Sequence, residues 1–152
     1  MVRKFLIYMA SYLCNMSRKE KVLFLSAHNS ARSQMAEALL RHLYGDRYLA
    51  YSAGVDPRDL DPLTVEVMAE RGIDVSRQSS KSMKELWGTA FDVVAKIRDW
   101  DIEPCPFFPA GKRRAHKNLA DPLAAEGLEE RRRALSEVRD DLERWIVEAF
   151  GG

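Results

Sequence analysis

A short, uninterrupted apolar run at Lys21–Leu25 (KVLFL) leads directly into a loop of small polar residues, and this junction constrains the fold most strongly. Continuous rather than alternating apolar character is typical of a strand buried on both faces, as in a parallel sheet. The loop, Ser26–Arg32, is followed by a helical pattern with Met35, Leu39 and Leu43 on one face. The junction therefore predicts a buried strand, a tight loop and a helix N-terminus in succession.

Further strands and helices alternate along the rest of the chain. We expect strands at Tyr48–Ser52, Phe91–Ala95 and Ala115–Leu119, a helix from Asp61-Pro62 to Gly72, a short helix around Ser82–Trp87, a loop at Arg98–Gly111, and a long amphipathic helix from Leu128 onward. Strands that alternate with helices predict an α/β fold with a parallel sheet. Ligands of such sheets bind beyond the carboxyl ends of the strands, where the Ser26–Arg32 loop is expected.

The length, charge and cysteine content limit the organisation of the chain and its partners. At 152 residues it fits one domain with its own core, and a net charge of +1 gives no bulk attraction to nucleic acid or to an anionic membrane. Cys14 and Cys105 form no CxxC pair, and the three histidines show no metal-ligand spacing. We therefore expect a cytoplasmic protein without disulfide, metal or cofactor, in which any anion site is local.

The first 18 residues are predicted to be separate from the domain. Phe5–Cys14 is an apolar run after a basic start, too short to span a membrane and followed by no small-residue cleavage site. Met16 opens a polar stretch directly before the first strand. We predict an appendage at 1–18, which is a docked helix, a partner-binding segment or a misplaced start, and a domain at 19–152.

The loop between the first strand and its helix has the composition of an anion cradle. Its backbone N–H groups lack intrahelical partners and lie at the positive end of the helix dipole. Small side chains let the backbone wrap closely around a tetrahedral oxyanion, and the planar fork of Arg32 can hold two of its oxygens. The alternative is an ordinary strand–helix turn with Arg32 in solvent. The predicted anion-binding residues are Ser26, Ala27, His28, Asn29, Ser30, Ala31 and Arg32.

A family resemblance is carried, in order and at matching spacing, by Val22–Glu37 (VLFLSAHNSARSQMAE), Tyr51–Gly54, Pro62–Ile73, Cys105-Pro106 and Asp121-Pro122. These segments are similar to the low-molecular-weight protein tyrosine phosphatase superfamily, above all to the thioredoxin-coupled arsenate reductases, whose loop reads Cys-x5-Arg-Ser. The resemblance covers about residues 20–148. It implies a three-layer α/β fold with a four-stranded parallel sheet in the flavodoxin-like order 2-1-3-4, flanked by helices.

The resemblance also assigns catalytic positions, and one of them departs from the family. The family's nucleophile is the cysteine that opens the loop, and this position holds Ser26, whose hydroxyl lacks the acidity of a thiol. Arg32 would bind the oxyanion, and Asp121 would be the general acid, although Asp121-Pro122 alone also fits a turn or helix cap. The missing thiolate predicts an anion cradle with little or no turnover.

A second departure concerns the redox cysteines of the arsenate reductases. Arg98 stands at the position of their second cysteine, and Cys105, seven residues later, matches the third. Without the first and second thiols no intramolecular disulfide relay can form, so arsenate reduction by the family mechanism is not expected and neither is thioredoxin as a partner. Arg98 is then either a second cation for the anion or a solvated loop arginine.

Support for the loop is implied by the resemblance as well. Some relatives hold a potassium ion behind the loop with residues that match Asn29, Glu37 and Ser52, and the aspartate that completes their site is replaced by Lys81. A lysine ammonium can substitute for the charge of the metal, so no bound potassium is expected. Asn29 and Ser33 would then brace the loop.

Three functional hypotheses remain open at this stage. The first is a non-catalytic member of the family that binds phosphate, arsenate or sulfate, or a phosphorylated ligand. The second is a protein tyrosine phosphatase (a phosphomonoester hydrolase) in a Cys-to-Ser form, for which Arg32 and Asp121 are intact. The third is an arsenate reductase, which lacks two of its three thiols.

Overall fold

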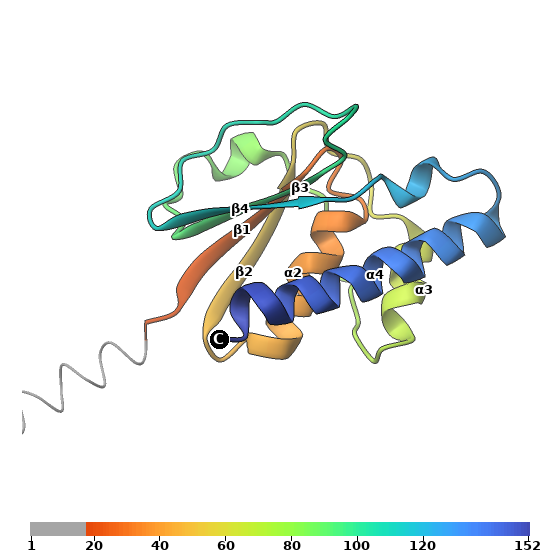
Figure 1. The fold of residues 1–152 in the computed structure, drawn as a ribbon, viewed down its shortest axis with the longest axis horizontal. Coiled ribbons are helices and arrows are strands. Elements are labelled where there is room, and N and C mark those ends of the chain that lie inside the picture. The colour runs from red at the N-terminus through yellow and green to blue at the C-terminus, as the bar shows by residue number, and fades with distance from the viewer. Residues whose placement is uncertain (1–17) are drawn as a thin grey trace, which may run out of the picture.

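Four parallel strands form one sheet in the order β2-β1-β3-β4 (Figure 1). This computed structural model describes residues 18–152, so the predicted appendage, apart from Arg18, lies outside the described residues. The strands are β1 Glu20–Ser26, β2 Tyr48–Gly54, β3 Val93–Arg98 and β4 Arg113–Asn118. The helices are α2 Arg32–Tyr44, α3 Pro62–Ala69 and α4 Leu128–Phe150, with short 3-10 helices η1 Met83–Leu86 and η2 Pro122–Ala124.

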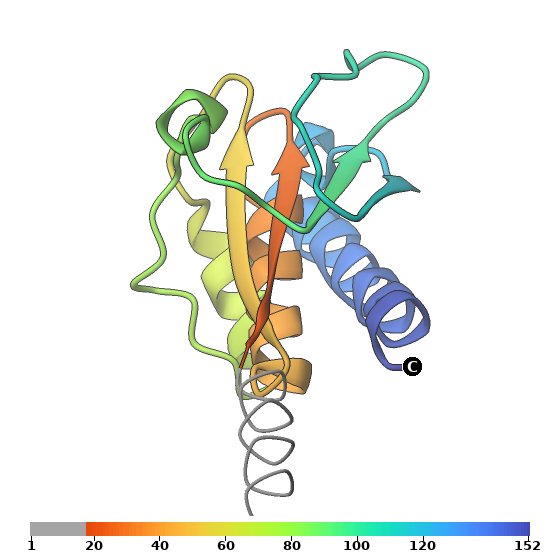
Figure 2. The ribbon, with the colours of Figure 1, turned by 90° about the vertical axis from the view of Figure 1, so that its left-hand side faces the viewer.

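The two faces of the sheet are covered differently. Helices α2, α3 and α4 pack against one face, and η1 with the loop after β3 covers the other (Figure 1 and Figure 2). In β1, Val22 and Phe24 belong to the core under the helices, whereas Leu23 and Leu25 belong to the core on the opposite face. Burial on both faces explains why the β1 sequence is apolar throughout rather than alternating.

The second core is small and rich in aromatic side chains. Its fully buried members are Leu23, Leu25, Ala53, Phe91, Val94 and Phe108. The rings of Phe91 and Phe108 pack edge to face at 5.7 Å between centroids. Because Phe108 comes from the loop after β3, this core anchors the far end of a long loop whose near end borders the site described below.

The register places the carboxyl ends of the strands at one edge of the sheet. β1 pairs with β2 from Glu20–Tyr48 to Ser26–Gly54, and β3 pairs with β4 as far as Arg98–Asn118. Because all strands are parallel, the loops that follow them gather at this edge, as expected for a binding site in an open α/β sheet.

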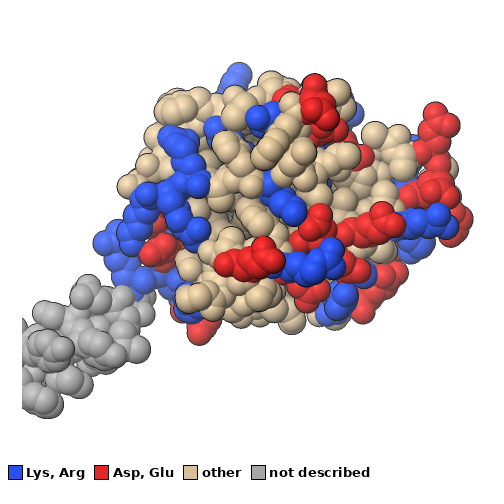
Figure 3. All heavy atoms as spheres, in the orientation of Figure 1, with Lys and Arg blue, Asp and Glu red and all other residues tan. Residues whose placement is uncertain are grey.

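Charged side chains of both signs are interleaved on the surface. On the face shown in Figure 3, acidic and basic side chains alternate over α4, and basic side chains gather near the start of the described chain. Several form ion pairs, such as Arg71–Asp140 and Lys117–Asp141. Among residues 18–152, no helix is long and apolar enough to cross a membrane.

The predicted α/β fold and strand order are confirmed, but the bounds of several strands differ from the predicted ones, most of all in β3 and β4. β3 begins at Val93 and continues to Arg98, so Arg98 ends a strand instead of opening a loop. Phe91 packs into the second core, and the Asp92 carboxylate accepts a hydrogen bond from Lys21 N–H at 2.9 Å. β4 begins at Arg113, opposite Val93 of β3, two residues before the predicted start. The prediction missed this start because the polar sequence of this edge strand (RRAHKN) gives little apolar signal.

Candidate functional site

The loop between β1 and α2 has all its carbonyl groups turned toward the surrounding protein. Each carbonyl from Ser26 to Ala31 accepts a hydrogen bond from a donor that lies outside Ser26–Ala31. The donors are Val55 N–H for Ser26, Asp56 N–H for Ala27, Arg58 N–H and Ser80 Oγ for His28, Gln34 Nε2 for Asn29, Asp61 N–H and Thr64 Oγ1 for Ser30, and Met35 N–H for Ala31, at 2.8–3.4 Å.

This arrangement determines where the N–H groups of the loop point. In a planar trans peptide the C=O and the next N–H point in opposite directions, and no described peptide bond is cis. Outward carbonyls therefore turn the following N–H groups toward the inside of the loop. Within residues 18–152, the N–H groups of Ala27, His28, Ser30 and Ala31 donate to no protein acceptor.

The N-terminus of α2 adds to this concentration of donors. No side chain caps it at Ala31, and its first turn contains no acidic residue. Helix N-termini normally receive such a cap or an acidic side chain, because their first N–H groups have no intrahelical acceptor and carry partial positive charge. The loop and the helix start together form a set of unpaired donors at the edge of the sheet.

Buried polar side chains brace the loop from within. Ser26 Oγ lies 2.6 Å from Ser33 Oγ and accepts a hydrogen bond from Asn29 N–H at 3.3 Å. Asn29 has φ +50°, is fully buried, and donates from Nδ2 to Ser33 Oγ at 2.8 Å. A positive φ is unusual outside glycine, so these contacts stabilise a backbone conformation that the loop needs in order to curl.

Gly54 at the end of β2 allows the loop to approach the sheet. A Cβ atom at this position would lie 2.9 Å from both Asn29 N and His28 C. Both are backbone atoms held by the contacts above, so neither can rotate away. A glycine is therefore required here by close packing rather than by its own φ.

The Arg32 guanidinium is buried and already engaged by a carboxylate. Its side chain is 3% exposed, and it forms a bidentate pair with Glu103, in which Nη1 contacts Oε1 and Nη2 contacts Oε2 at 2.8 Å. Nη1 also donates to Leu119 O at 3.0 Å. From the sequence, Arg32 was expected either to bind an anion or to lie in solvent. In the structure, its guanidinium is paired with the Glu103 carboxylate of the same chain.

Glu103 is ionised in this environment. Burial raises the pKa of its carboxyl, but the hydrogen bonds from Arg32 and from Asp99 N–H, with the charge of Arg32, outweigh that effect, so the pKa lies below its ordinary value of 4.5. Its side chain is 12% exposed. At neutral pH the pair is therefore a guanidinium and a carboxylate in planar, two-point contact.

Asp121 faces the same guanidinium while capping a short helix. Its Oδ2 lies 4.0 Å from Arg32 Nη2, and its Oδ1 accepts a hydrogen bond from Leu123 N–H at 3.0 Å. Both interpretations of Asp121 from sequence, a cap and a group facing the loop, thus describe part of its position. A pocket of about 310 Å³ lies between the loop and this cap, lined among others by His28, Ser30 and Asp61.

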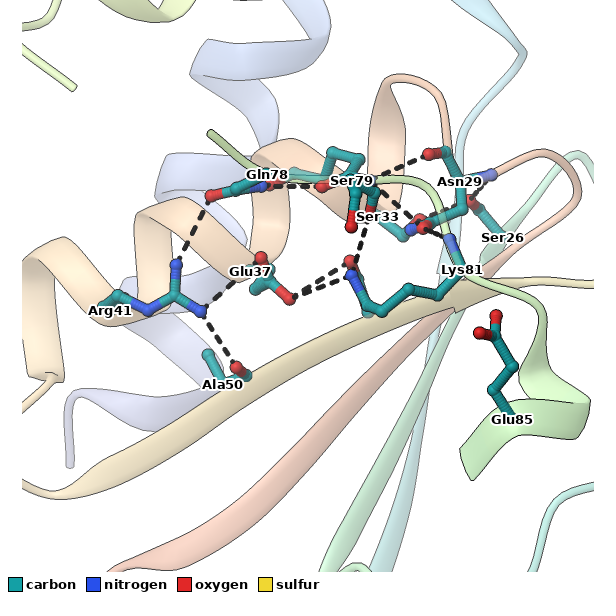
Figure 4. A network of polar contacts seen from close by, with 12 residues as sticks. Ser26, Asn29, Ser33, Glu37, Arg41, Ala50, Gln78, Ser79, Lys81 and Glu85 are labelled. Atoms are coloured by element: carbon teal, nitrogen blue, oxygen red, sulfur yellow. Dashed lines mark hydrogen bonds and ion pairs between the residues drawn. The ribbon is translucent and has the colours of Figure 1, made fainter. Parts of the chain in front are cut away.

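Behind the loop, a lysine ammonium meets the buried Glu37 carboxylate (Figure 4). Lys81 Nζ lies 4.0 Å from Glu37 Oε1 and donates to Ser79 O at 2.8 Å, while Ser52 Oγ donates to Glu37 Oε1 at 3.3 Å. The Lys81 N–H donates to Asn29 Oδ1 at 2.8 Å, which links this network to the loop. A positive charge is thus supplied to Glu37 by the chain itself, from Lys81 and from Arg41 at 3.5 Å.

Arg98 is the last residue of β3, and Cys105 lies in the segment that follows β3. Arg98 Nη1 donates to Glu103 O at 3.1 Å, so its guanidinium holds the segment that carries Glu103. Cys105 is an exposed free thiol, with Sγ 3.6 Å from Lys96 Nζ and 3.9 Å from His116 Nε2. Burial lowers the pKa of His116, and the charges of nearby cations, of which Lys96 contributes most, lower it further.

Comparison with known proteins identifies the family of this site. A sequence model of the low molecular weight phosphotyrosine protein phosphatase family matches residues 21–148. The chain belongs to this family. The arsenate reductase of Shouchella clausii (strain KSM-K16) is 40% identical over 126 residues, which cover 82% of this chain and 90% of that relative.

Solved structures of other proteins share the architecture. An arsenate reductase in the phosphate binding state is similar with a TM-score of 0.68 and 28% identity, over 85% of this chain and 98% of that chain. The tyrosine phosphatase Wzb from Escherichia coli K30, in complex with sulphate, shares the fold with a TM-score of 0.66 and 19% identity, over 86% of this chain and 99% of that chain.

The structure places the residues that were predicted from the sequence in two groups. Ser26 to Ser33 form the loop and its brace, and Glu37, Ser52 and Lys81 form the network behind it. Sequence reasoning missed Glu103 and the packing role of Gly54. A buried arginine needs a counter-charge, and this was the one sequence-level reason to expect an acidic partner for Arg32. It does not identify Glu103 among the 23 acidic residues of the chain.

Proposed function

We propose that this chain binds a tetrahedral oxyanion, namely phosphate, arsenate or sulfate, free or as part of a phosphorylated ligand, in the Ser26–Arg32 loop. The observation that carries the proposal is the inward orientation of the loop N–H groups, which follows from the outward, hydrogen-bonded carbonyls. Such a nest of donors at a helix N-terminus is suited to an anion and to little else. The predicted cytoplasmic location is part of this proposal.

Two further observations support an oxyanion. Arg32 presents its two-point fork beside the loop, and that fork already holds two carboxylate oxygens. The similar arsenate reductase whose structure is in a phosphate binding state shares 28% identity with this chain over nearly its whole length. Phosphate and arsenate are both tetrahedral and carry the charge that the unpaired donors favour.

Turnover is expected to be slight because Ser26 has no base beside it. Its Oγ contacts Ser33 Oγ and Asn29 N–H, and neither can remove its proton at neutral pH. His28 Nδ1 instead lies 3.0 Å from Asp56 O. A serine hydroxyl without a base is a far weaker nucleophile than the thiolate that the family resemblance implies at this position.

A phosphomonoester hydrolase is the second candidate, and the position of Asp121 favours it. Its carboxylate faces the Arg32 guanidinium across 4.0 Å, where a general acid could reach the leaving oxygen of a bound phosphate ester. Arsenate reduction coupled to thioredoxin is disfavoured, because positions 26 and 98 hold serine and arginine. Each redox thiol of the relay needs its partner thiol within reach.

The binding proposal is tested by thermal shift and calorimetry with inorganic phosphate, arsenate and sulfate. The wild-type chain should be stabilised by about 2.7 kcal/mol when the anion is present at about 100 times its Kd. Arg32→Ala and the charge-preserving Arg32→Lys should both lose most of this response. Arg133→Ala, at an exposed arginine of α4, is the control and should retain it. An equal response in all four proteins would contradict the proposal.

Catalytic competence is tested separately with Ser26→Cys. This variant should hydrolyse para-nitrophenyl phosphate, whereas the wild-type chain should show little activity. The same variant should not reduce arsenate with thioredoxin, because Arg98 cannot resolve an oxidised thiol at position 26. Efficient coupled reduction would contradict this account of the relay, and wild-type hydrolysis at the rate of Ser26→Cys would contradict the lack of turnover.

A further inference from the structure

Glu103 occupies the part of Arg32 that an oxyanion would use. Oε1 of Glu103 accepts from Nη1 of the guanidinium and Oε2 accepts from Nη2. The Glu103 side chain is 12% exposed and that of Arg32 is 3% exposed. A tetrahedral oxyanion held by an arginine fork also takes two parallel N–H···O contacts, and Nη1 with Nη2 is one of the donor pairs that the guanidinium can offer it. On this pair of nitrogens the carboxylate and an incoming oxyanion compete for the same donors.

The competing carboxylate is presented by a compact turn rather than by a flexible tail. Glu103 N–H donates to Asp99 O at 2.9 Å, and Asp99 N–H donates to Glu103 Oε1 at 2.7 Å. Arg98 Nη1 holds Glu103 O at 3.1 Å, and Trp100 N–H donates to Asn118 Oδ1 at 3.0 Å. These contacts place the turn at the carboxyl ends of β3 and β4, beside the loop.

Little apolar packing holds the turn down. Trp100 is 52% exposed and Ile102 is 80% exposed, so withdrawing this segment exposes little additional apolar surface. The turn contacts the Ser26–Arg32 loop through the bidentate Arg32–Glu103 pair. An anion that competes for Arg32 thus removes the ion pair that joins the turn to the Ser26–Arg32 loop.

We infer that Glu103 is a specificity-determining residue that acts as a built-in competitor for the oxyanion. This inference rests on the proposed function, since it presumes that the Ser26–Arg32 loop binds the anion. A ligand that takes the Nη1–Nη2 pair must displace a carboxylate of charge −1, because one pair of donors cannot hold two anions in the same positions. The competition favours dianions such as hydrogen phosphate, hydrogen arsenate and sulfate over monoanions, which gain no charge advantage over Glu103.

Competition also lowers the apparent affinity for every ligand. When the free protein holds Glu103 on Arg32 most of the time, the apparent Kd is the intrinsic Kd divided by the fraction of molecules with the fork free. A free fraction of about one in ten raises the apparent Kd about tenfold. Removing the charge of Glu103 recovers that factor.

The test compares Glu103→Gln with Asp101→Asn by calorimetric titration of inorganic phosphate. Both variants remove one negative charge from the same turn, but of these two side chains only that of Glu103 pairs with Arg32. Glu103→Gln should bind phosphate about tenfold more tightly than the wild-type chain, and Asp101→Asn should remain within about twofold. Unchanged or weaker binding by Glu103→Gln would overturn the inference.

Hydrogen exchange supplies a second measurement that needs no variant. Amides of residues 99–103 in the wild-type chain should exchange faster when phosphate is added, because the turn leaves Arg32, and slower exchange or no change would overturn the inference. The proposed function fails separately. If neither the wild-type chain nor Glu103→Gln binds phosphate, both fail, whereas wild-type binding that Glu103→Gln leaves unchanged removes only the role of Glu103.

Discussion

A single methyl group at position 54 is expected to disturb both the stability of the domain and its anion site. In Gly54→Ala the new Cβ would lie 2.9 Å from Asn29 N and from His28 C, well inside normal contact distance. These atoms are backbone, and Asn29 is held by Ser33, Gln34 and Lys81, so relief requires the loop to move as a unit. Overpacking of this kind costs about 1–3 kcal/mol, which lowers the Tm of a chain of this size by about 2–12 °C.

Anion binding should suffer as well, because the displaced peptides carry inward N–H groups. Loss of one hydrogen bond to a charged ligand costs about 1.5–3 kcal/mol, so the Kd for phosphate should rise about tenfold or more. Calorimetry and urea unfolding of the same samples measure the two effects. Gly88→Ala is the control, because a Cβ there meets nothing within 4 Å. Wild-type stability and phosphate affinity in Gly54→Ala would refute the close contact on which this reasoning depends.

Other predictions concern charge and catalysis at the same edge of the sheet. The folded-state pKa of Glu103 lies below the ordinary value of 4.5, so the stability that its carboxylate contributes is present above pH 4.5 and is lost as the pH falls through the lower folded-state pKa. Acid unfolding of Glu103→Gln should lack this loss of stability. A stability–pH profile of Glu103→Gln that matches the wild type would contradict this prediction. Lys81→Ala leaves the buried Glu37 with a poorer counter-charge and should cost about 1–3 kcal/mol in urea unfolding. Lys84→Ala, at an exposed lysine nearby, is the control and should leave the free energy of unfolding unchanged. The wild-type Tm should be equal in KCl and NaCl. A rise in the wild-type Tm that is specific to potassium would argue against the Lys81 ammonium as the cation beside Glu37. In the Ser26→Cys background, Asp121→Asn should slow hydrolysis of para-nitrophenyl phosphate about 10²–10⁴-fold, and a rate unchanged by this substitution would remove the general-acid role.

The local part of the site was accessible from sequence because it depends on adjacent residues. The apolar run of β1, the small residues of the loop and the helical pattern after Arg32 are contiguous, and each follows from backbone and burial rules that act over a few residues. The edge strand β4 was placed less well, since its polar residues face solvent on one side. Its position follows from pairing with β3 rather than from its own composition.

The contacts that control Arg32 were not accessible in the same way. Arg32 and Glu103 are 71 positions apart, and Glu103 lies in a segment whose prolines predict only a loop. Even with the strand order known, side-chain contacts at the edge of the sheet depend on how the loop after β3 turns. The Asp99–Glu103 turn is set by hydrogen bonds to Arg98 and Asn118, which no periodicity reports.

The position of a bound oxyanion is the most direct test, and a crystal structure of the wild-type chain with phosphate or arsenate measures it. The anion should lie inside the Ser26–Arg32 loop, within hydrogen-bond distance of the N–H groups of Ala27, His28, Ser30 and Ala31. Two of its oxygens should contact the Arg32 guanidinium, and the Glu103 carboxylate should have moved away. An anion bound elsewhere, with Glu103 still paired to Arg32 beside an empty loop, would contradict the account.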